Sequence, residues 1–248
     1  ILGKWTFKNL YFTYPGTDRE VLKDINLEIN AGESVALLGT TGSGKSTIAL
    51  LMARFYDPVA GDILLDDIPL RDWDIQHVRA HLGFVPQDVF LFSTTIAENI
   101  RFGQDDLSEE QMKQAARFAD VYDNIMDFPD QFETILGERG VTLSGGQKQR
   151  VSLARALAKN PLILVLDDCL SAVDTHTEHK ILTHLKSIMQ DKTSLIISHR
   201  VSSAKLANRV FVLQDGAIVE QGKHAQLMRK KGLYYDLYQQ QLNEEQGL

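Results

Sequence analysis

A glycine-rich stretch at positions 39–47 constrains the fold of this chain more than any other feature. It reads Gly-Thr-Thr-Gly-Ser-Gly-Lys-Ser-Thr and matches the pattern G-x-x-x-x-G-K-[ST]. A short apolar run at 34–38 precedes it, and helix-compatible sequence follows from 45 to about 55. The pattern therefore predicts a buried strand, a tight glycine loop and a helix, with the loop at the carboxyl end of the strand.

The same loop predicts phosphate binding. Glycines let several backbone N–H groups point inward, and the helix that follows adds partial positive charge at its start. The Lys45 side chain would reach the outer phosphates of a nucleotide, and the Ser46 hydroxyl would ligate Mg²⁺. A chance glycine turn is the alternative, and the strand before the loop and the helix after it argue against it. The residues expected to bind nucleotide are Gly39, Thr40, Thr41, Gly42, Ser43, Gly44, Lys45, Ser46 and Thr47.

Two carboxylates follow the most apolar run of the chain. Residues 162–166 read Leu-Ile-Leu-Val-Leu, and Asp167 and Asp168 come directly after them. In an α/β sheet, ligands bind beyond the carboxyl ends of the strands. We therefore expect Asp167 to hold Mg²⁺ and Asp168 to orient the attacking water. The alternative is a solvated pair of aspartates that caps the strand.

Further short apolar runs alternate with segments of helical period. Strands are expected within the first 30 residues and at 63–65, 82–85, 194–198 and 210–213, and the helical period dominates from about 108 to 157. This order predicts an α/β fold with a mostly parallel sheet and helices on both faces. The helical block between Gln87 and Pro161 interrupts the alternation, which indicates an inserted subdomain. The polar end of the chain, 239–248, is expected to fray.

Length and charge narrow the class of protein. A chain of 248 residues suits one large domain or two small ones. Its formal net charge of −7 argues against a general nucleic-acid binder, and its one cysteine, Cys169, excludes an internal disulfide. No stretch of 18 residues is apolar throughout. Because the chain starts at Ile1 without a methionine, we expect a fragment of a longer chain or a processed start.

A second glycine motif lies at 143–147, with the sequence Leu-Ser-Gly-Gly-Gln, and a helical run follows it. A serine and two glycines at a helix start can form another anion-binding cap. A flexible loop before a helix is the alternative. The stretch resembles the signature motif of ABC ATPases, and the order of helix, apolar strand and acidic pair after it fits that family. The corresponding residues are Leu143, Ser144, Gly145, Gly146 and Gln147.

This resemblance implies an ABC ATPase of the P-loop NTPase class. The expected fold is α/β, with a mostly parallel core sheet, an N-terminal antiparallel β subdomain and a helical subdomain at about 88–160. All of 1–248 would form one nucleotide-binding domain that uses ATP and Mg²⁺. Its signature would act on ATP held by a second ABC cassette, and the chain would bind no nucleic acid.

Other landmarks of the family fall in the expected order. Tyr14 resembles the aromatic residue that stacks on adenine, although a core or edge tyrosine is the alternative. Gln87 resembles the Q-loop glutamine, which senses Mg²⁺, takes part in catalysis and links to the membrane part. His199 resembles the switch histidine near the γ-phosphate. The residues that resemble the D-loop are Ser171, Ala172, Val173 and Asp174.

Residues 134–140, Thr-Ile-Leu-Gly-Glu-Arg-Gly, resemble the X-loop of ABC exporters. The resemblance implies that Glu138 and Arg139 touch the coupling helices of a transmembrane domain, on the cytoplasmic side of a membrane. The phenylalanines that follow Gln87 would lie on the same docking surface if they are exposed. A buried satellite cluster is the alternative for them.

One position departs from the family. The family has a catalytic glutamate where this chain has Asp168, whose side chain is shorter by one methylene, roughly 1.5 Å. We therefore expect slow hydrolysis at this site, as in the weak-site subunit of a heterodimeric exporter whose partner supplies a glutamate. One alternative is a regulatory module that gates a channel or transporter with little turnover. A soluble ABC protein of DNA repair or translation is another, but the coiled-coil insertions, paired cysteines and tandem cassettes of that class are absent.

Overall fold

The computed structural model describes residues 1–138 and 140–247 and divides into two compact units. The first unit comprises residues 1–82, 162–167 and 189–248, and the second comprises 83–161 and 168–188. The assignment of 1–248 to one domain, and the bounds of about 88–160 for its helical subdomain, stay predictions.

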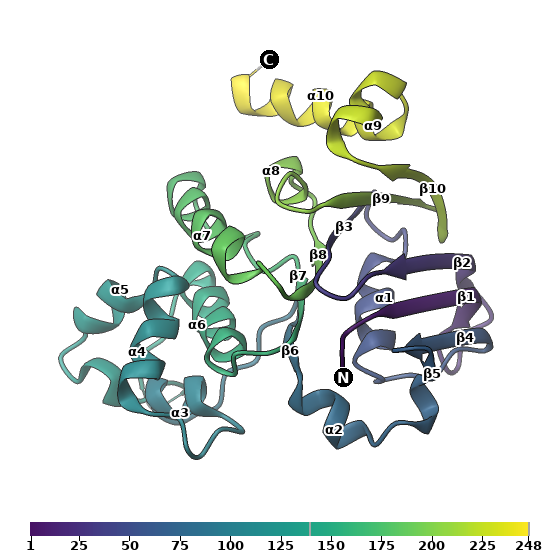
Figure 1. Ribbon diagram of the computed structural model, residues 1–248. Helices are drawn as coiled ribbons and strands as arrows, with labels where there is room; N and C mark the ends of the chain where they lie inside the picture. The colour runs from purple at the N-terminus through teal and green to yellow at the C-terminus, as the bar shows by residue number, and fades with distance from the viewer. Residues whose placement is uncertain (139, 248) are drawn as a thin grey trace. The chain divides into compact units, whose positions relative to one another are not determined.

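A four-stranded antiparallel sheet occupies the N-terminal part of the first unit (Figure 1). Its order is β2-β1-β4-β5, formed by β1 (Trp5–Thr13), β2 (Glu20–Ile29), β4 (Ala60–Leu65) and β5 (Ile68–Pro69). Trp5 lies opposite Ile29 and Phe7 opposite Leu27, and all four side chains are buried. The alternation of apolar and polar residues in this part of the sequence follows from burial of one sheet face. The predicted antiparallel β subdomain is confirmed.

The core sheet has six strands in the order β10-β9-β3-β8-β7-β6. They are β3 (Ser34–Gly39), β6 (Leu82–Val85), β7 (Ile163–Asp167), β8 (Thr193–Ile197), β9 (Arg209–Gln214) and β10 (Ala217–Gly222). Within the run β9-β3-β8-β7, each strand is parallel to the next, which confirms the mostly parallel sheet. Every residue of β3, β7 and β8 is buried, which explains their continuous apolar sequences. The antiparallel strand β10 was not predicted.

The first unit also contains helical elements. They are α1 (Lys45–Met52), the 3₁₀ turn η1 (Leu70–Asp72), α2 (Ile75–Ala80), α8 (Val201–Ala204), α9 (His224–Lys230) and α10 (Leu233–Gln246). Helix α1 lies beside the four-stranded sheet, whereas α8, α9 and α10 lie over β9 and β10 (Figure 1). The expectation that 239–248 frays is wrong for most of that stretch, because α10 continues to Gln246. In the described part of the chain, no helix is long and apolar enough to span a membrane.

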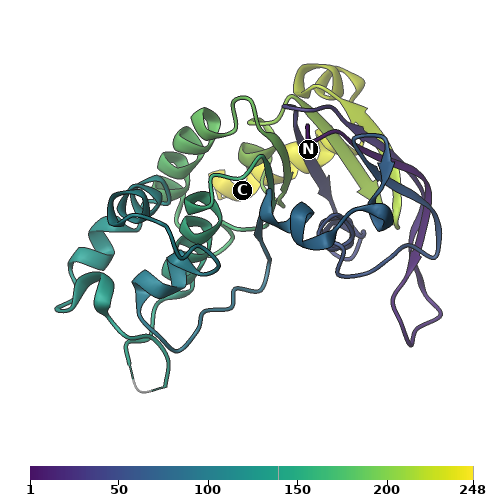
Figure 2. The same ribbon diagram turned by 60° about the horizontal axis from the view of Figure 1, so that its bottom comes forward.

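The second unit is mainly helical, which confirms the predicted helical block (Figure 2). It contains α3 (Ile96–Arg101), α4 (Glu109–Phe118), α5 (Tyr122–Met126), the 3₁₀ turn η2 (Gln131–Glu133), α6 (Gly145–Ala158) and α7 (Thr175–Ile188). Ser108 begins α4 with a capping box: its side chain accepts the Gln111 N–H, and the Gln111 side chain accepts the Ser108 N–H. After α4, Asp120 has a φ of 54°, so the chain leaves the helical conformation before α5.

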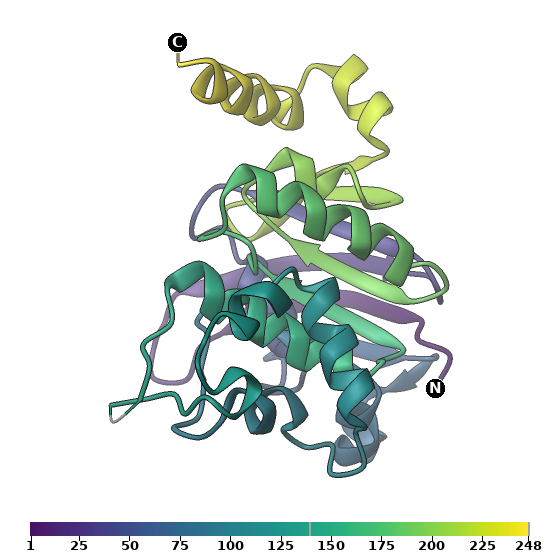
Figure 3. The same ribbon diagram turned by 90° about the vertical axis from the view of Figure 1, so that its left-hand side faces the viewer.

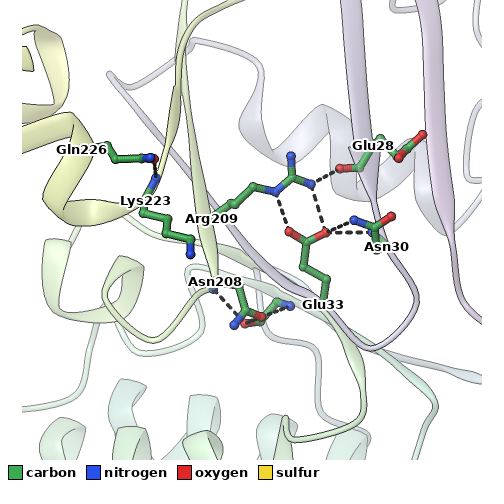
Figure 4. A network of polar contacts seen from close by, with 8 residues as sticks. Glu28, Asn30, Glu33, Asn208, Arg209, Lys223 and Gln226 are labelled. Atoms are coloured by element: carbon green, nitrogen blue, oxygen red, sulfur yellow. Dashed lines mark hydrogen bonds and ion pairs between the residues drawn. The ribbon is translucent and has the colours of Figure 1, made fainter.

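A polar network holds the start of β3, the strand that carries the glycine loop (Figure 4). The Asn208 side-chain oxygen accepts the Ser34 N–H at 2.8 Å, and the Ser34 carbonyl accepts the Asn208 N–H at 2.8 Å. Next to it, the Arg209 guanidinium donates to the Glu33 carboxylate at 3.0 Å and to the Glu28 carbonyl at 2.6 Å. These bonds tie β3 to β9 and to the end of β2.

We expect Arg209→Met to lower the free energy of unfolding by about 1–2 kcal/mol at pH 7, because it leaves Glu33 partly buried without its ion-pair partner. Burial alone would raise the pKa of Glu33, but hydrogen bonds from Arg209 and Asn30 outweigh it and hold that pKa below its usual range. The pair therefore stabilises the fold above the unfolded-state pKa of about 4.3 and loses its effect as pH falls through the lower native pKa.

Urea unfolding of both proteins between pH 7 and 3 measures this effect. The difference between wild type and Arg209→Met should shrink on the acidic side. Arg71→Met is the control, since the Arg71–Asp62 pair is exposed and worth under about 1 kcal/mol. Equal destabilisation by the two substitutions would contradict the prediction.

Candidate functional site

Three neighbouring strands of the first unit end at one edge of the core sheet. The order β3-β8-β7 puts Leu37 beside Ile197, and Ile197 beside Asp167. The glycine loop starts at Gly39, two residues after Leu37, and His199 follows two residues after Ile197. The loop, the histidine and the first carboxylate thus come together at the carboxyl edge, where ligands bind in folds of this kind.

The glycine loop is closely packed against its surroundings. Gly39 has a φ of 157°, and a Cβ atom there would lie 2.3 Å from the carbonyl oxygen of Leu213. The Ser43 N–H donates to the Thr40 carbonyl at 3.1 Å, and the Gly216 N–H donates to the Ser43 carbonyl at 3.1 Å. Only glycine fits at the first position of the motif, which is the reason the sequence pattern requires it.

Lys45 lies across the loop. Its side chain is only 5% exposed, and its Nζ donates to the carbonyls of Gly39 at 2.7 Å and Thr40 at 3.0 Å. Helix α1 begins at Lys45 after Gly44, and its first turn contains no acidic side chain. An ammonium group and a helix start therefore present positive charge at the same point, as a phosphate-binding site needs.

The two predicted Mg²⁺ ligands of the first unit touch each other. The Ser46 hydroxyl donates to Asp167 Oδ1 at 3.1 Å, and Asp167 is 3% exposed. A hydroxyl and a carboxylate oxygen, together with phosphate oxygens and water, are the ligands that Mg²⁺ takes in nucleotide sites. These residues fit the ion that the sequence predicts.

Tyr14 packs at the edge of this site. Its hydroxyl and the Thr47 Oγ1 of α1 are 2.6 Å apart, and its ring makes edge-to-face contacts with Phe12 and Tyr56. The half-buried ring is thus fixed relative to the helix that carries the loop. Stacking of adenine on Tyr14 stays a prediction.

His199 is exposed, and a contact that the sequence did not indicate holds its backbone. The side-chain amide of Gln241, on α10, donates to the His199 carbonyl at 3.4 Å and accepts the Val201 N–H at 2.5 Å. No local pattern could reveal this pair, because the two segments are separated by about 40 residues.

The signature segment begins α6 in the second unit. The Ser144 side chain accepts the Gln147 N–H at 3.2 Å, and the Gln147 side chain accepts the Ser144 N–H at 3.0 Å, which forms a capping box. This arrangement uses Ser144 Oγ as an acceptor and leaves its hydroxyl proton to donate elsewhere. The N–H groups of Gly145 and Gly146 stand in the first turn, where a helix has no acceptors of its own.

The D-loop segment lies against α6 within the same unit. Gln149 is buried, donates to the Ser171 hydroxyl at 2.8 Å and accepts the Ala172 N–H at 2.8 Å. A Cβ atom on Gly146 would lie 2.8 Å from the Ala172 carbonyl. Asp174 caps α7, and a hydrogen bond from the Thr177 N–H lowers the pKa of Asp174. Gln149 was not among the predicted site residues, although it lies only two residues after the signature.

Asp168 comes directly after β7, is half-buried and has a φ of 49°, a region that aspartate adopts more readily than most residues. Gln87 and Glu138 are exposed. Arg139 lies outside the described residues. The roles assigned to these four residues stay predictions.

Aromatic side chains gather in the segment after Gln87. Phe90 is 64% exposed and Phe102 is 58% exposed, and both contact the ring of Phe92. Ile135, which is 56% exposed, pairs with Thr95 through an isolated β-bridge. The alternative of a fully buried cluster is therefore wrong for these side chains.

Taken together, the glycine loop, Lys45 and the Ser46–Asp167 contact define a P-loop nucleotide-binding protein, and the start of α6 adds a second anion-binding motif. A family profile described as ABC transporter matches residues 22–171, more than half of the chain. The chain belongs to the ABC transporter family.

Individual relatives agree with this assignment. The chain is 45% identical over 97% of its length to ATP-binding cassette sub-family B member 5 of Homo sapiens, and 44% identical over 99% to the ATP-dependent lipid A-core flippase of Chromobacterium violaceum. It spans 19% and 42% of the length of these two relatives. The solved structure of a bacterial Atm1-family ABC exporter with ATP bound matches with a TM-score of 0.93 and 42% identity, over 98% of this chain and 43% of that one.

Proposed function

We propose that this chain is the ATP-binding and ATP-hydrolysing cassette of an ABC exporter. The observation that carries the proposal is the contact between Ser46 and Asp167 beside the buried Lys45, which suits a magnesium-bound triphosphate. ABC exporters and a flippase are among the relatives, and the chain covers less than half of each. The transport activity and the transmembrane domain belong to the longer protein that we infer.

In this function, the first unit binds the nucleotide. Backbone N–H groups of the glycine loop and Lys45 would hold the phosphates, and Tyr14 would stack on adenine. Ser46 and Asp167 would hold Mg²⁺, which neutralises charge on the phosphates when it is bound. The further Mg²⁺ ligand that the sequence predicts, Gln87, belongs to the second unit. His199 would contact the γ-phosphate.

The signature would serve the nucleotide of a second cassette. Ser144 keeps a hydroxyl proton to donate, and the start of α6 offers N–H groups to an anion. A head-to-tail dimer would place this helix start against the γ-phosphate held by the partner. The contacts of Gln149 with Ser171 and Ala172 would then link the signature to the D-loop.

The exposed aromatic side chains support a docking role on the cytoplasmic side of a membrane. Phe90, Phe102 and Ile135 expose apolar area in one unit, and the Leu136 N–H donates to the Thr94 carbonyl at 2.9 Å, which joins the X-loop to the segment after Gln87. Exposed apolar side chains of this size suit a protein interface. We infer that they contact the coupling helices of a transmembrane domain, together with Glu138 and Arg139.

Asp168 supports a finer proposal, in which the partner cassette is a non-identical subunit with a glutamate at this position. The site of this chain would then hydrolyse ATP slowly, while its signature completes the faster site of the partner. A regulatory module with little turnover is the second candidate, and Asp168 is also the observation that favours it. ATPase measurements with and without a glutamate-bearing partner separate the two, because only the first candidate gains turnover from that partner.

Substitution of Ser144 tests the head-to-tail arrangement. In a mixed dimer, Ser144→Ala should slow hydrolysis at the partner's site by about 10-fold or more, because one donor to the transition state is lost. Single-turnover hydrolysis with one site disabled at a time measures this effect.

Ser108→Ala is the matched control for Ser144→Ala, because Ser108 also forms a capping box in the second unit and lies outside the signature. The two substitutions remove the same kind of cap. If Ser144→Ala slows only the site that contains Lys45, the head-to-tail arrangement is wrong.

A further inference from the structure

The C-terminal helix α10 returns to the segment that carries His199. Figure 3 shows α10, in yellow, at the top of the view, with α9 beside it. Its partly buried side chains Leu237 and Tyr238 pack on a core cluster that includes Val201 and Ala204 of α8. Helix α8 begins two residues after His199, so α10 packs directly against the peptide that follows the histidine.

The Gln241 side-chain amide forms hydrogen bonds with the backbone of this segment at residues 199 and 201. It donates to the His199 carbonyl at 3.4 Å and accepts the Val201 N–H at 2.5 Å. The Arg200 N–H donates to the Ser198 hydroxyl at 2.9 Å. A side-chain amide offers one donor and one acceptor in the manner of a peptide group, so Gln241 binds this backbone as a neighbouring strand would.

Helix α10 is itself firmly attached, which makes Gln241 a defined partner. Tyr234 is fully buried, its N–H donates to Glu220 Oε2 at 2.8 Å, and its hydroxyl lies 2.5 Å from His224 Nδ1. One turn later, the Lys205 Nζ donates to the Tyr238 hydroxyl at 3.3 Å. Gln241 comes three residues after Tyr238, within the same helix.

Packing alone does not fix the histidine. A cavity of about 330 Å³ lies between the glycine loop, His199 and α10, lined in part by Thr40, Thr41, Ser198, His199, Gln241 and Glu244. A side chain that faces open space lacks the close contacts that hold core residues. The hydrogen bonds between Gln241 and this backbone therefore contribute strongly to fixing the position of His199.

We propose that Gln241 is a positioning residue for His199, through which the C-terminal helix sets the rate of ATP hydrolysis at this site. The inference rests on the proposed function, because the position of His199 matters only in a cassette that hydrolyses ATP. It adds a residue that no motif of the chain contains. Gln241 touches neither nucleotide nor metal in this proposal and acts through the backbone of residues 199–201.

Three substitutions in the complete transporter test the proposal. Gln241→Met removes both hydrogen bonds at similar volume, and Gln241→Glu keeps the acceptor and loses the donor. Gln240→Met changes the exposed neighbour, which lines the same cavity and whose amide donates to Glu244 on its own helix. Single-turnover hydrolysis is measured at this site with the partner's site disabled, and MgATP affinity is measured by calorimetry.

Gln241→Met should lower the hydrolysis rate roughly 5- to 20-fold with affinity within about twofold, because a displacement of about 1 Å at a catalytic group can cost about 100-fold. Gln241→Glu should give an intermediate rate. Gln240→Met should stay within about twofold of wild type. Equal rates for Gln241→Met and Gln240→Met would overturn the inference.

A double-mutant cycle with His199→Ala separates positioning from a general structural effect. If Gln241 acts through His199, Gln241→Met should change the rate of the His199→Ala variant by less than about twofold. Full additivity, or an unchanged rate in His199→Ala alone, would overturn the inference. Hydrogen exchange at the Val201 amide gives a readout without turnover, and it should be faster in Gln241→Met than in Gln240→Met.

The outcomes also distinguish this inference from the proposed function. A wild-type transporter that neither binds nor hydrolyses MgATP would refute the proposed function. A transporter that binds and hydrolyses MgATP, and whose Val201 amide exchanges equally in both variants, would refute only the role of Gln241.

Discussion

Replacing Lys45 by alanine is expected to remove most ATP binding, with a loss of affinity of about 100-fold or more, roughly 2.7 kcal/mol. The Lys45 ammonium lies buried across the glycine loop, within 3.0 Å of two of its carbonyl groups. Phosphate oxygens brought to this loop would gain a charge-assisted hydrogen bond from it. Calorimetric titration with MgATP measures the change.

The control for Lys45→Ala is Lys23→Ala, an exposed lysine of the same unit, which should bind MgATP with wild-type affinity. Thermal unfolding without nucleotide must accompany the titration, because Lys45 also donates to the Gly39 and Thr40 carbonyls. A folded Lys45→Ala protein with unchanged affinity would refute the assignment of the loop.

Replacing Asp168 by glutamate is expected to raise hydrolysis at this site 10-fold or more, roughly 1.4 kcal/mol of barrier, with little change in ATP affinity. Aspartate and glutamate carry the same carboxylate group, so the expected difference comes from the length of the side chain, because the attacking water must be held in line with the γ-phosphate. The assay is single-turnover hydrolysis in a dimer whose other site is disabled.

Asp168→Asn is the matched control, since asparagine keeps the shape and removes the charge. It should change the low rate that we propose for this site only modestly. Asp168 has a φ of 49°, where aspartate and asparagine are favoured, so Asp168→Glu can cost up to about 1 kcal/mol of stability. Thermal unfolding of all three proteins accounts for that cost. A flat rate in a stable Asp168→Glu protein would place the defect in the signature contributed by the partner.

The chemistry of the first unit could be predicted from the sequence because it depends on neighbours in the chain. The glycine loop, Lys45 and Ser46 are contiguous, and the apolar strand before Asp167 marks the end of a buried parallel strand. The sequence predicts both Ser46 and Asp167 as Mg²⁺ ligands, whereas the direct hydrogen bond between them depends on the order β3-β8-β7.

Strand β10 and the end of α10 were not predicted, because they depend on contacts with residues that are distant in the sequence. Strand β10 has one buried residue, Glu220, and otherwise shows partly or fully exposed residues, so its sequence lacks the apolar run that revealed the central strands. It forms because the turn at Asp215 and Gly216 returns it onto β9. The polar end of the chain looked unstructured, yet α10 continues to Gln246 because its apolar side chains and Gln241 find partners in the first unit.

The class of fold and the identity of the reactive groups could thus be predicted from motifs of at most nine consecutive residues. Which distant groups meet depends on the packing of the folded chain. Gln149 bonds to residues 171 and 172, and Gln241 bonds to residues 199 and 201. A glutamine amide pairs with whichever donor or acceptor packing brings within hydrogen-bonding distance, and periodicity along the chain carries no information about that choice.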